Sequence, residues 1–310
     1  MAARTNAAGA PRRRRRFSLL TREDKIVLGF LIGVPAVIHI ALVWVPTISS
    51  ILLSFTSWSG IGGLETIRFV GFDNYERLAT VYPPFWPALQ HNLIWLGVFL
   101  FVATPIGMFM AVLLDKNIRG SRVYQSALYL PFVLSLAVIG FIWQLQYAPE
   151  EGFINNVLGT NTERNLISWL GDRDLNLWAV LVAASWRHVG YIMVIYLAGL
   201  KGVDPSLREA AMIDGASERQ IFFRVVFPVL RPVNIVVLVI TIIDSLRAFD
   251  IVYVINRGRN GLELLSVLVT QNILGEASRI GFGSAIAVVL LVISLGPILF
   301  YLTRTYEEPS

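Results

Sequence analysis

The stretch EAAMIDGASERQIFFRVVFPVLRP, from Glu209 to Pro232, lies between two apolar runs and contains strong helix start and stop signals. Asp204 is placed to cap a helix that begins at Pro205, where a missing N–H costs no helical hydrogen bond. The pair Asp214-Gly215 predicts the end of this helix, because glycine readily adopts the left-handed conformation found there. This part of the chain is therefore predicted to be a short polar helix followed by a tight turn.

A second helix is predicted directly after the turn. Ser217 and Gln220 have the spacing of a capping box, and Pro228 and Pro232 are expected to close the helix. Its large apolar side chains, which would anchor it to the membrane core, are Phe222, Phe223 and Phe227. A charged helix-turn-helix between two apolar runs is suited to binding a partner protein.

The composition indicates a membrane protein. Mean hydropathy is +0.63, 55% of the residues are hydrophobic and 15% are charged, whereas a soluble domain usually has about 25% charged residues. Crossing a hydrocarbon core of roughly 30 Å takes about 20 apolar residues. The sequence therefore predicts an all-α integral membrane protein with six transmembrane helices. They are placed near residues 26 to 53, 92 to 114, 123 to 146, 176 to 199, 233 to 255 and 281 to 303.

The distribution of Lys and Arg predicts the orientation, because these residues are enriched on the cytoplasmic side. The N-terminal segment is basic through Arg4, the run Arg12 to Arg16, Arg22 and Lys25. With six spans, the helix-turn-helix loop and Arg304 fall on the same side as this segment. Both termini are thus expected in the cytoplasm, and the arginine run is interpreted as a solvated tail that touches anionic lipid.

Several enzyme classes are excluded by the residues themselves. The chain has no cysteine and three histidines, none of which begins an HExxH pair. The lysines at 25, 116 and 201 are not preceded by glycine, so no Gly-Lys-Ser/Thr phosphate loop is present. The chain is therefore predicted to catalyse no reaction, with no cofactor and no metal of its own, and any ATP and magnesium would be bound by a partner.

The motifs resemble those of binding-protein-dependent ABC importer permeases, in particular their sugar-type subgroup. The EAA and DGA spacing of Glu209 to Ala216 is similar to the cytoplasmic EAA loop of that family. Further segments that resemble the subgroup are FVGFDNYERL at 69 to 78, LYLPF at 128 to 132, YLAGLKGVDPSLREAAMIDGA at 196 to 216 and AFDIVYVI at 248 to 255. The turn Gly258-Arg259-Asn260-Gly261 departs from the Gly-Gly-Pro turn that many members have.

The resemblance implies a type I ABC importer permease fold and a set of partners. A second permease subunit would complete the translocation path, two copies of an ATPase would dock below, and an extracytoplasmic solute-binding protein would deliver a sugar. It also implies a bacterial cytoplasmic (inner) membrane location. The ATPase-coupling residues would be Glu209, Ala210, Ala211, Asp214, Gly215, Ala216 and Ser217, with Glu209 to Ser217 forming a coupling helix.

Ionisable residues inside the predicted spans are candidates for the substrate path, because a charge in the bilayer costs a few kcal/mol. These are Arg187, Asp244, Arg247 and Asp250. The last three recur at i, i+3 and i+6, so on one helix they would form adjacent ion pairs. An internal ion-pair network, a contact with the second permease and a lining of the path all remain open.

Aromatic and amide side chains near the outer ends of the spans are further candidates, since sugars bind to aromatic faces and planar polar groups. They are Trp143, Gln144, Tyr147, Trp186, Tyr191, Phe249, Tyr253 and Asn256. For each aromatic residue alone, helix packing or a place at the membrane interface is the more ordinary explanation.

The predicted organisation has four parts: a basic tail at 1 to 25, a first span with an outer segment at 26 to 87, a five-helix core at 88 to 304 that includes the coupling loop 200 to 232, and a short tail at 305 to 310. The predicted function is the membrane subunit of an ATP-driven carbohydrate importer. Alternatives are the same importer type with a polyol phosphate such as glycerol 3-phosphate as cargo, or an ion-coupled secondary transporter, although no convincing inverted repeat is seen.

Overall fold

The computed structural model describes residues 21 to 116, 118 to 162, 164 to 275 and 278 to 306. The arginine run at 12 to 16 and most of both predicted tails lie outside these residues. The described part is mostly helical, and an isolated antiparallel bridge joins Thr56 to Phe69. The chain divides into two compact units, Met1–Ser49 and Ser50–Ser310.

The first described residues form one continuous helical segment. It consists of α1 (Arg22–His39), η1 (Ile40–Trp44) and α2 (Val45–Leu53). After α2 come η2 (Leu64–Thr66) and α3 (Asp73–Thr80). The remaining elements are α4 (Phe85–Val98), η3 (Phe99–Ala103), α5 (Thr104–Asp115), α6 (Ser121–Val133), α7 (Leu136–Gln146), α8 (Phe153–Leu158), α9 (Arg173–Lys201), α10 (Pro205–Ile213), α11 (Glu218–Ile221), η4 (Phe222–Val226), α12 (Phe227–Val229), α13 (Arg231–Leu246), α14 (Asp250–Asn256), α15 (Leu265–Ile273) and α16 (Ile280–Tyr306).

Four described helices are long and apolar enough to cross a membrane: Arg22–Leu53, Phe85–Asp115, Arg173–Lys201 and Ile280–Leu299. Two helix pairs meet the same criterion together but are bent, by 101° between α6 and α7 and by 76° between the α11 to α12 segment and the helices after it. Counting each bent pair as one span gives six, as predicted. The span predicted near 123 to 146 is formed by the bent pair α6 and α7.

The bend between α6 and α7 has a local cause. Pro131 lies in the last turn of α6, Leu134 is extended with ψ 146°, and the Ser135 hydroxyl accepts a hydrogen bond from the Val138 N–H to start α7. Proline weakens the helical turn before it, and the serine cap stabilises the first turn of the new helix. The apolar run is continuous in sequence, which is why hydropathy alone did not reveal the break.

Three prolines in the helical segments follow widened turns. The π-helical segments η1, η3 and η4 each end two residues before a proline, at Pro46, Pro105 and Pro228. A proline ring clashes with the carbonyl of the preceding turn, and a π turn moves that carbonyl away. This explains why Pro46 does not end the first helix.

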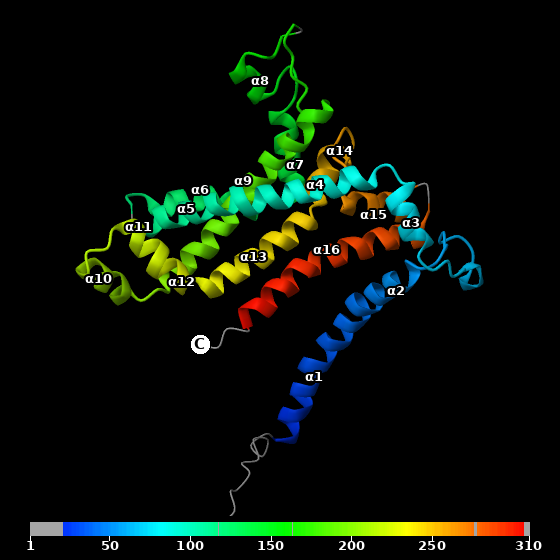
Figure 1. The fold of residues 1–310 in the computed structure, drawn as a ribbon, viewed down its shortest axis with the longest axis horizontal. Coiled ribbons are helices and arrows are strands. Elements are labelled where there is room, and N and C mark those ends of the chain that lie inside the picture. Colours follow the sequence, from blue (N-terminus) through cyan, green and yellow to red (C-terminus); the bar gives the residue numbers. More distant parts are fainter. Residues whose placement is uncertain (1–20, 117, 163, 276–277, 307–310) are drawn as a thin grey trace, which may run out of the picture. The chain divides into compact units, whose positions relative to one another are not determined.

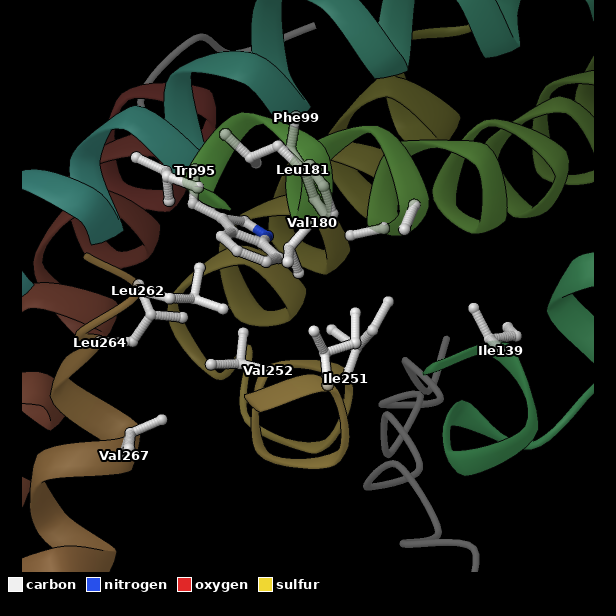
Figure 2. Packing of buried hydrophobic residues seen from close by; sticks show 14 of the residues in the cluster. Trp95, Phe99, Ile139, Val180, Leu181, Ile251, Val252, Leu262, Leu264 and Val267 are labelled. Carbon is white, nitrogen blue, oxygen red and sulfur yellow. The ribbon is translucent and has the colours of Figure 1, made fainter. Parts of the chain in front are cut away.

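The second unit is held by three buried apolar clusters, and the first of them surrounds the region of greatest functional interest. It joins Trp95 and Phe99 with residues of α9, α14 and the segment after α14. Figure 2 shows side chains from these elements projecting into one common space, with Trp95, Val180 and Ile251 among them. The second cluster lies around Leu200 and Ile221, and the third around Leu78 and Leu265.

Close helix packing in the second unit depends on glycine. A Cβ on Gly107 of α5 would lie 2.9 Å from the carbonyl oxygen of Val189 in α9. A Cβ on Gly190 would overlap the carbonyl of Leu128 in α6. Helix α9 therefore packs directly against both α5 and α6, and Figure 1 shows these three helices side by side.

Candidate functional site

The loop between α9 and α13 has the cap structures that the sequence predicts. The Asp204 carboxylate accepts a hydrogen bond from the Ser206 N–H at 2.9 Å, and Pro205 is the first residue of α10. The Ser206 backbone bond lowers the pKa of Asp204, so the cap stays ionised near neutral pH. At the other end, Gly215 has φ +77° and the Ala216 N–H bonds to the Ala211 carbonyl, which is a Schellman-type helix end.

The second helix starts as expected but is shorter and less regular. The Ser217 hydroxyl accepts from the Gln220 N–H, and the Gln220 side chain accepts from the Ser217 N–H at 2.8 Å, which completes the capping box. After one turn of α11 the chain widens into η4, and α12 ends before Leu230. The expectation that Pro228 and Pro232 close this helix is wrong, because Pro228 lies inside the helical segment and Pro232 lies in the first turn of α13.

The predicted coupling residues fall into two groups. Glu209, Ala210, Asp214, Gly215 and Ser217 are exposed. Ala211 and Ala216 are half-buried and pack against the second core cluster. The helix itself is Pro205–Ile213, so the expectation of a helix through Ser217 is wrong, since Asp214 to Ser217 form the turn. The exposed face available to a partner is therefore made by the end of α10 and this turn.

Two ion pairs that the sequence did not reveal connect the loop to α5. Arg208 of α10 lies 2.8 Å from the carboxylate of Asp115, and Lys116 lies 2.6 Å from Glu218 of α11. All four side chains line an apolar cavity of about 560 Å³ between α5 and the loop. The two adjacent residues at the end of α5 thus hold one helix of the loop each.

A second cavity, of about 190 Å³, gathers most of the predicted ionisable residues. Its charged lining consists of Arg187 on α9, Asp244 on α13, and Arg247 and Asp250 at the junction of α13 and α14. Further lining residues are Trp95, Phe99, Leu136, Ala184, His188, Ala248, Phe249 and Ile251. Residues from α4, η3, α7, α9, α13 and α14, and from the junction between the last two, therefore meet around one small polar space.

The expected helical ladder of Asp244, Arg247 and Asp250 is wrong. Helix α13 ends at Leu246, and α14 begins at Asp250, so the three residues do not share one helix. Asp244 instead lies beside His188, whose Nδ1 is 3.8 Å from the carboxylate. The interruption turns Arg247 and Asp250, both exposed, toward the cavity instead of along a helix surface.

Two carbonyl groups at this interruption, those of Leu246 and Ala248, accept hydrogen bonds from side chains outside α13 and α14. Asn92 of α4 donates to the Leu246 carbonyl at 3.4 Å and accepts from the Leu265 N–H at 2.9 Å. Ser266 donates to the Ala248 carbonyl. Irregular backbone at membrane depth is tolerated where it is bonded in this way or lines a cavity, and both conditions hold here.

Arg187 is held on an aromatic surface. Its guanidinium carbon lies 4.7 Å from the centre of the Phe132 ring, and Phe132 stacks on Tyr191 at 4.1 Å. A cation over an aromatic face is stabilised in a desolvated site. Tyr191 therefore supports Arg187 from behind and does not line the cavity itself.

The other predicted aromatic and amide candidates lie outside this cavity. Gln144 donates to the carbonyls of Val254 and Ile255, Tyr147 donates to the Ala179 carbonyl, and Asn256 donates to the Arg259 carbonyl. Trp143 packs against Trp186 and Tyr147, whereas Tyr253 stacks on Phe249 at the edge of the cavity. Phe249 and Tyr253 are thus the aromatic pair closest to the predicted role.

Seven lining residues were not predicted from the sequence, and three of them, His188, Trp95 and Phe99, have aromatic rings. His188 is 2% exposed, stacks on Phe99 at 4.3 Å and lies 3.4 Å from the Thr241 hydroxyl through Nε2. Trp95 is 1% exposed, and its indole N–H has no hydrogen-bond partner among the described residues. A signal existed for His188, which directly follows Arg187 in an apolar run. Trp95 and Phe99 look like ordinary core residues in sequence.

Among the described residues, no group of three or more His, Cys, Asp or Glu side chains is arranged to hold a metal ion. What the cavity offers is a set of guanidinium, carboxylate and indole donors and acceptors beside aromatic faces. Such a lining suits reversible binding of a small polar molecule.

The comparisons with known proteins identify the family. Residues 103–307 match the family described as "Binding-protein-dependent transport system inner membrane component". This chain belongs to that family of ABC importer permeases. The permease is 31% identical to the probable ABC transporter permease protein PH1215 of Pyrococcus horikoshii, over 93% of this chain and 99% of that protein. It is 32% identical to the xylose/arabinose import permease protein XacH of Haloferax volcanii, over 89% of this chain and 87% of that protein.

Further matches extend the comparison. The permease is 31% identical to the arabinooligosaccharides transport system permease protein AraP of Halalkalibacterium halodurans, over 87% of this chain and 85% of that protein. Its fold is similar to that of a chain in the crystal structure of a bacterial ABC transporter involved in the import of the acidic polysaccharide alginate. The TM-score is 0.77 at 19% identity, with 92% of this chain and 97% of that chain covered. The fold class predicted from the sequence is thereby confirmed.

Proposed function

We propose that this permease is the membrane subunit of a carbohydrate importer and forms half of the translocation path. The observation that carries the proposal is the doubly capped, exposed loop between α9 and α13, in a chain of a binding-protein-dependent transport family. A second permease completes the path, and two copies of an ATPase bind and hydrolyse ATP with magnesium. An extracytoplasmic solute-binding protein delivers the substrate, and both termini lie in the cytoplasm.

The proposed contact with the ATPase is the exposed face of α10 and its turn. Glu209 and Asp214 present carboxylates there, and Ala210 and Gly215 leave room for a close approach. A Cβ on Gly215 would meet nothing within 4 Å, so the space above the turn is open. Closure of the ATPase pair then moves this loop as a unit against the transmembrane helices.

Replacing Gly215 tests this contact. Gly215→Pro forces φ to about −65° at a position that has φ +77°, so the turn must change shape. Gly215→Asn is the matched control, because asparagine tolerates the left-handed conformation. In the reconstituted complex, we expect the proline variant to lose substrate-stimulated ATP hydrolysis and uptake while the asparagine variant keeps both. Wild-type coupling in an assembled Gly215→Pro complex would remove the basis of the proposal.

A sugar is favoured as cargo by the names of the relatives and by the charge balance of the smaller cavity. The guanidinium groups of Arg187 and Arg247 are accompanied by the carboxylates of Asp244 and Asp250. An anionic cargo would need cations that are free to bind it. We therefore propose a neutral sugar or oligosaccharide that binds through hydroxyl groups and the aromatic faces near Phe249.

The second candidate, a polyol phosphate, is separated from the first by competition. Uptake of a panel of labelled substrates is measured in the presence of unlabelled competitors. We expect pentoses or short oligosaccharides to inhibit this uptake and glycerol 3-phosphate to have no effect on it. The Asp244→Asn variant, which leaves more positive charge in the cavity, is expected to shift this preference toward the anion. Uptake of glycerol 3-phosphate by the wild-type complex, with no sugar transported, would replace the sugar assignment.

A further inference from the structure

The end of α5 carries a charge that its position disfavours. Asp115 is the last residue of this helix, where the carbonyl groups make the backbone electrically negative. A carboxylate there is stable only with a nearby cation, and Arg208 supplies it at 2.8 Å. The Asp115 side chain is 15% exposed and the Arg208 side chain 32%, so this pair is largely shielded from water. The contact therefore joins α10 to α5 more firmly than a surface ion pair would.

The same guanidinium reaches a third helix. Nη2 of Arg208 donates to the carbonyl of Leu200, in the last turn of α9, at 3.4 Å. The Leu200 carbonyl also accepts from the Val203 N–H at 3.3 Å, and its second lone pair leaves room for the guanidinium. The planar guanidinium allows one nitrogen to bind Asp115 while another binds Leu200. Arg208 thus contacts the ends of α5 and α9 from α10.

The two helices held by Arg208 are the ones that supply much of the cavity wall. Helix α9 carries Arg187 and His188, about 18 Å along its axis from Leu200 at 1.5 Å per residue. The continuous helix that ends at Asp115 carries Trp95 and Phe99. Helices α5 and α9 pack on each other through Gly107, without a large side chain between them. A displacement of their common end therefore reaches the cavity through rigid, packed elements.

We propose that Arg208 is a positioning residue for transport, which transmits movement of the coupling loop to α5 and α9 through its simultaneous bonds to Asp115 and Leu200. This inference rests on the proposed contact between the loop and the ATPase. The chain connection through residues 202 to 204 also joins the loop to α9. The loop nevertheless acts on the translocation path mainly through the guanidinium of Arg208. Without that group, α10 moves on its hinge and the helices do not follow.

The second ion pair of the loop provides an internal control. Lys116 and Glu218 are 53% and 84% exposed, and they connect α5 to α11 alone. An exposed pair of this kind contributes little to stability or to force transmission. If any charge contact near the loop were sufficient, the two pairs would be equivalent. The proposal requires them to differ.

The experiment measures ATP hydrolysed per substrate imported in proteoliposomes that contain the whole complex. The variants are Arg208→Gln, Asp115→Asn and the exchange Asp115→Arg with Arg208→Asp, with Glu218→Gln as the matched control. We expect Arg208→Gln and Asp115→Asn each to raise the ATP cost per substrate at least about threefold, because coupling changes of this kind lie within about 2- to 30-fold. The exchange variant restores the ion pair but not the bond to Leu200, because an aspartate carboxylate only accepts hydrogen bonds, so its ATP cost should stay raised. Glu218→Gln should stay within about twofold of wild type.

The outcomes separate this inference from the function on which it rests. If Gly215→Pro uncouples the complex but Arg208→Gln and Asp115→Asn leave the ATP cost unchanged, the loop is the contact and the role of Arg208 is refuted. If the single variants fail to assemble, the exchange variant decides. Restored assembly with impaired coupling supports the proposal, and assembly with wild-type coupling, or no assembly, overturns it.

Discussion

His188 and Asp244 meet where α9 passes α13, with Nδ1 of the histidine 3.8 Å from the carboxylate. The other ring nitrogen lies 3.4 Å from the Thr241 hydroxyl, which in turn lies 3.2 Å from the Thr104 hydroxyl. The buried imidazole therefore connects the charged cavity to a polar contact between α5 and α13. It orients Asp244 from one side while Phe99 fixes the plane of its ring.

The variant His188→Leu tests this connection. The leucine side chain is of similar size but apolar, so the variant removes both polar contacts of the imidazole. We expect the free energy of unfolding to fall by about 1–3 kcal/mol. Uptake should fall as well, since Asp244 loses the group that orients it. Thermal unfolding in detergent and uptake in proteoliposomes measure the two effects. Val182→Leu, at an exposed position of the same helix, is the control. Unchanged unfolding and uptake in His188→Leu would contradict the assignment.

Asn92 is expected to be essential for the interruption between α13 and α14. Asn92→Leu leaves the Leu246 carbonyl and the Leu265 N–H without the side chain that binds them in a buried site. Each unsatisfied group costs about 1–3 kcal/mol, so the melting temperature of the purified permease should drop. Leu93→Val, at a neighbouring exposed position, should leave it unchanged. A melting temperature like that of the wild type for Asn92→Leu would show that other groups satisfy the break.

Two glycine-to-alanine variants should have opposite effects. Gly190→Ala places a methyl group on the Leu128 backbone and should destabilise the permease by about 1–3 kcal/mol through overpacking. Gly97→Ala meets nothing within 4 Å and replaces a flexible residue in a helix, so a gain of about 0.5–1 kcal/mol is expected. Denaturant or thermal unfolding compares the two. Equal effects of the two variants would mean that α6 and α9 are not in backbone contact.

The cap of α10 gives a prediction that involves pH. Hydrogen bonds from Ser206 lower the pKa of Asp204 below its ordinary value of 3.8. A group with a lowered folded-state pKa stabilises the structure above its unfolded pKa and loses this effect as pH falls through the folded value. The cap should therefore be constant across neutral pH.

Hydrogen exchange at the first amides of α10 measures this cap. Asp204→Asn should keep the protection, because asparagine is also a good cap, whereas Asp204→Ala should lose it at every pH. Equal exchange in the wild type and the alanine variant would show that Pro205 alone sets the helix start.

The local features of the loop were predictable because they depend on residues that are close in sequence. Asp204, Pro205 and Gly215 act within one turn of α10, and the Ser217 and Gln220 pair needs only a spacing of three. The apolar spans were equally visible, since the length of an apolar run is a property of the sequence alone. The bend after Pro131 was missed because an apolar run conceals a break whose cause is a backbone conformation.

The sequence by itself thus determined the membrane class, the capped loop and the family motifs. Tertiary structure alone decided which charges meet. Arg208 and Asp115 are separated by 93 positions, and His188 and Thr241 by 53, so no local pattern pairs them. The ladder expected for Asp244, Arg247 and Asp250 was wrong for the same reason. Asn92 and Ser266, which lie outside α13 and α14, bind the backbone where α13 ends. These hydrogen bonds lower the free energy of the interrupted backbone below that of a continuous helix.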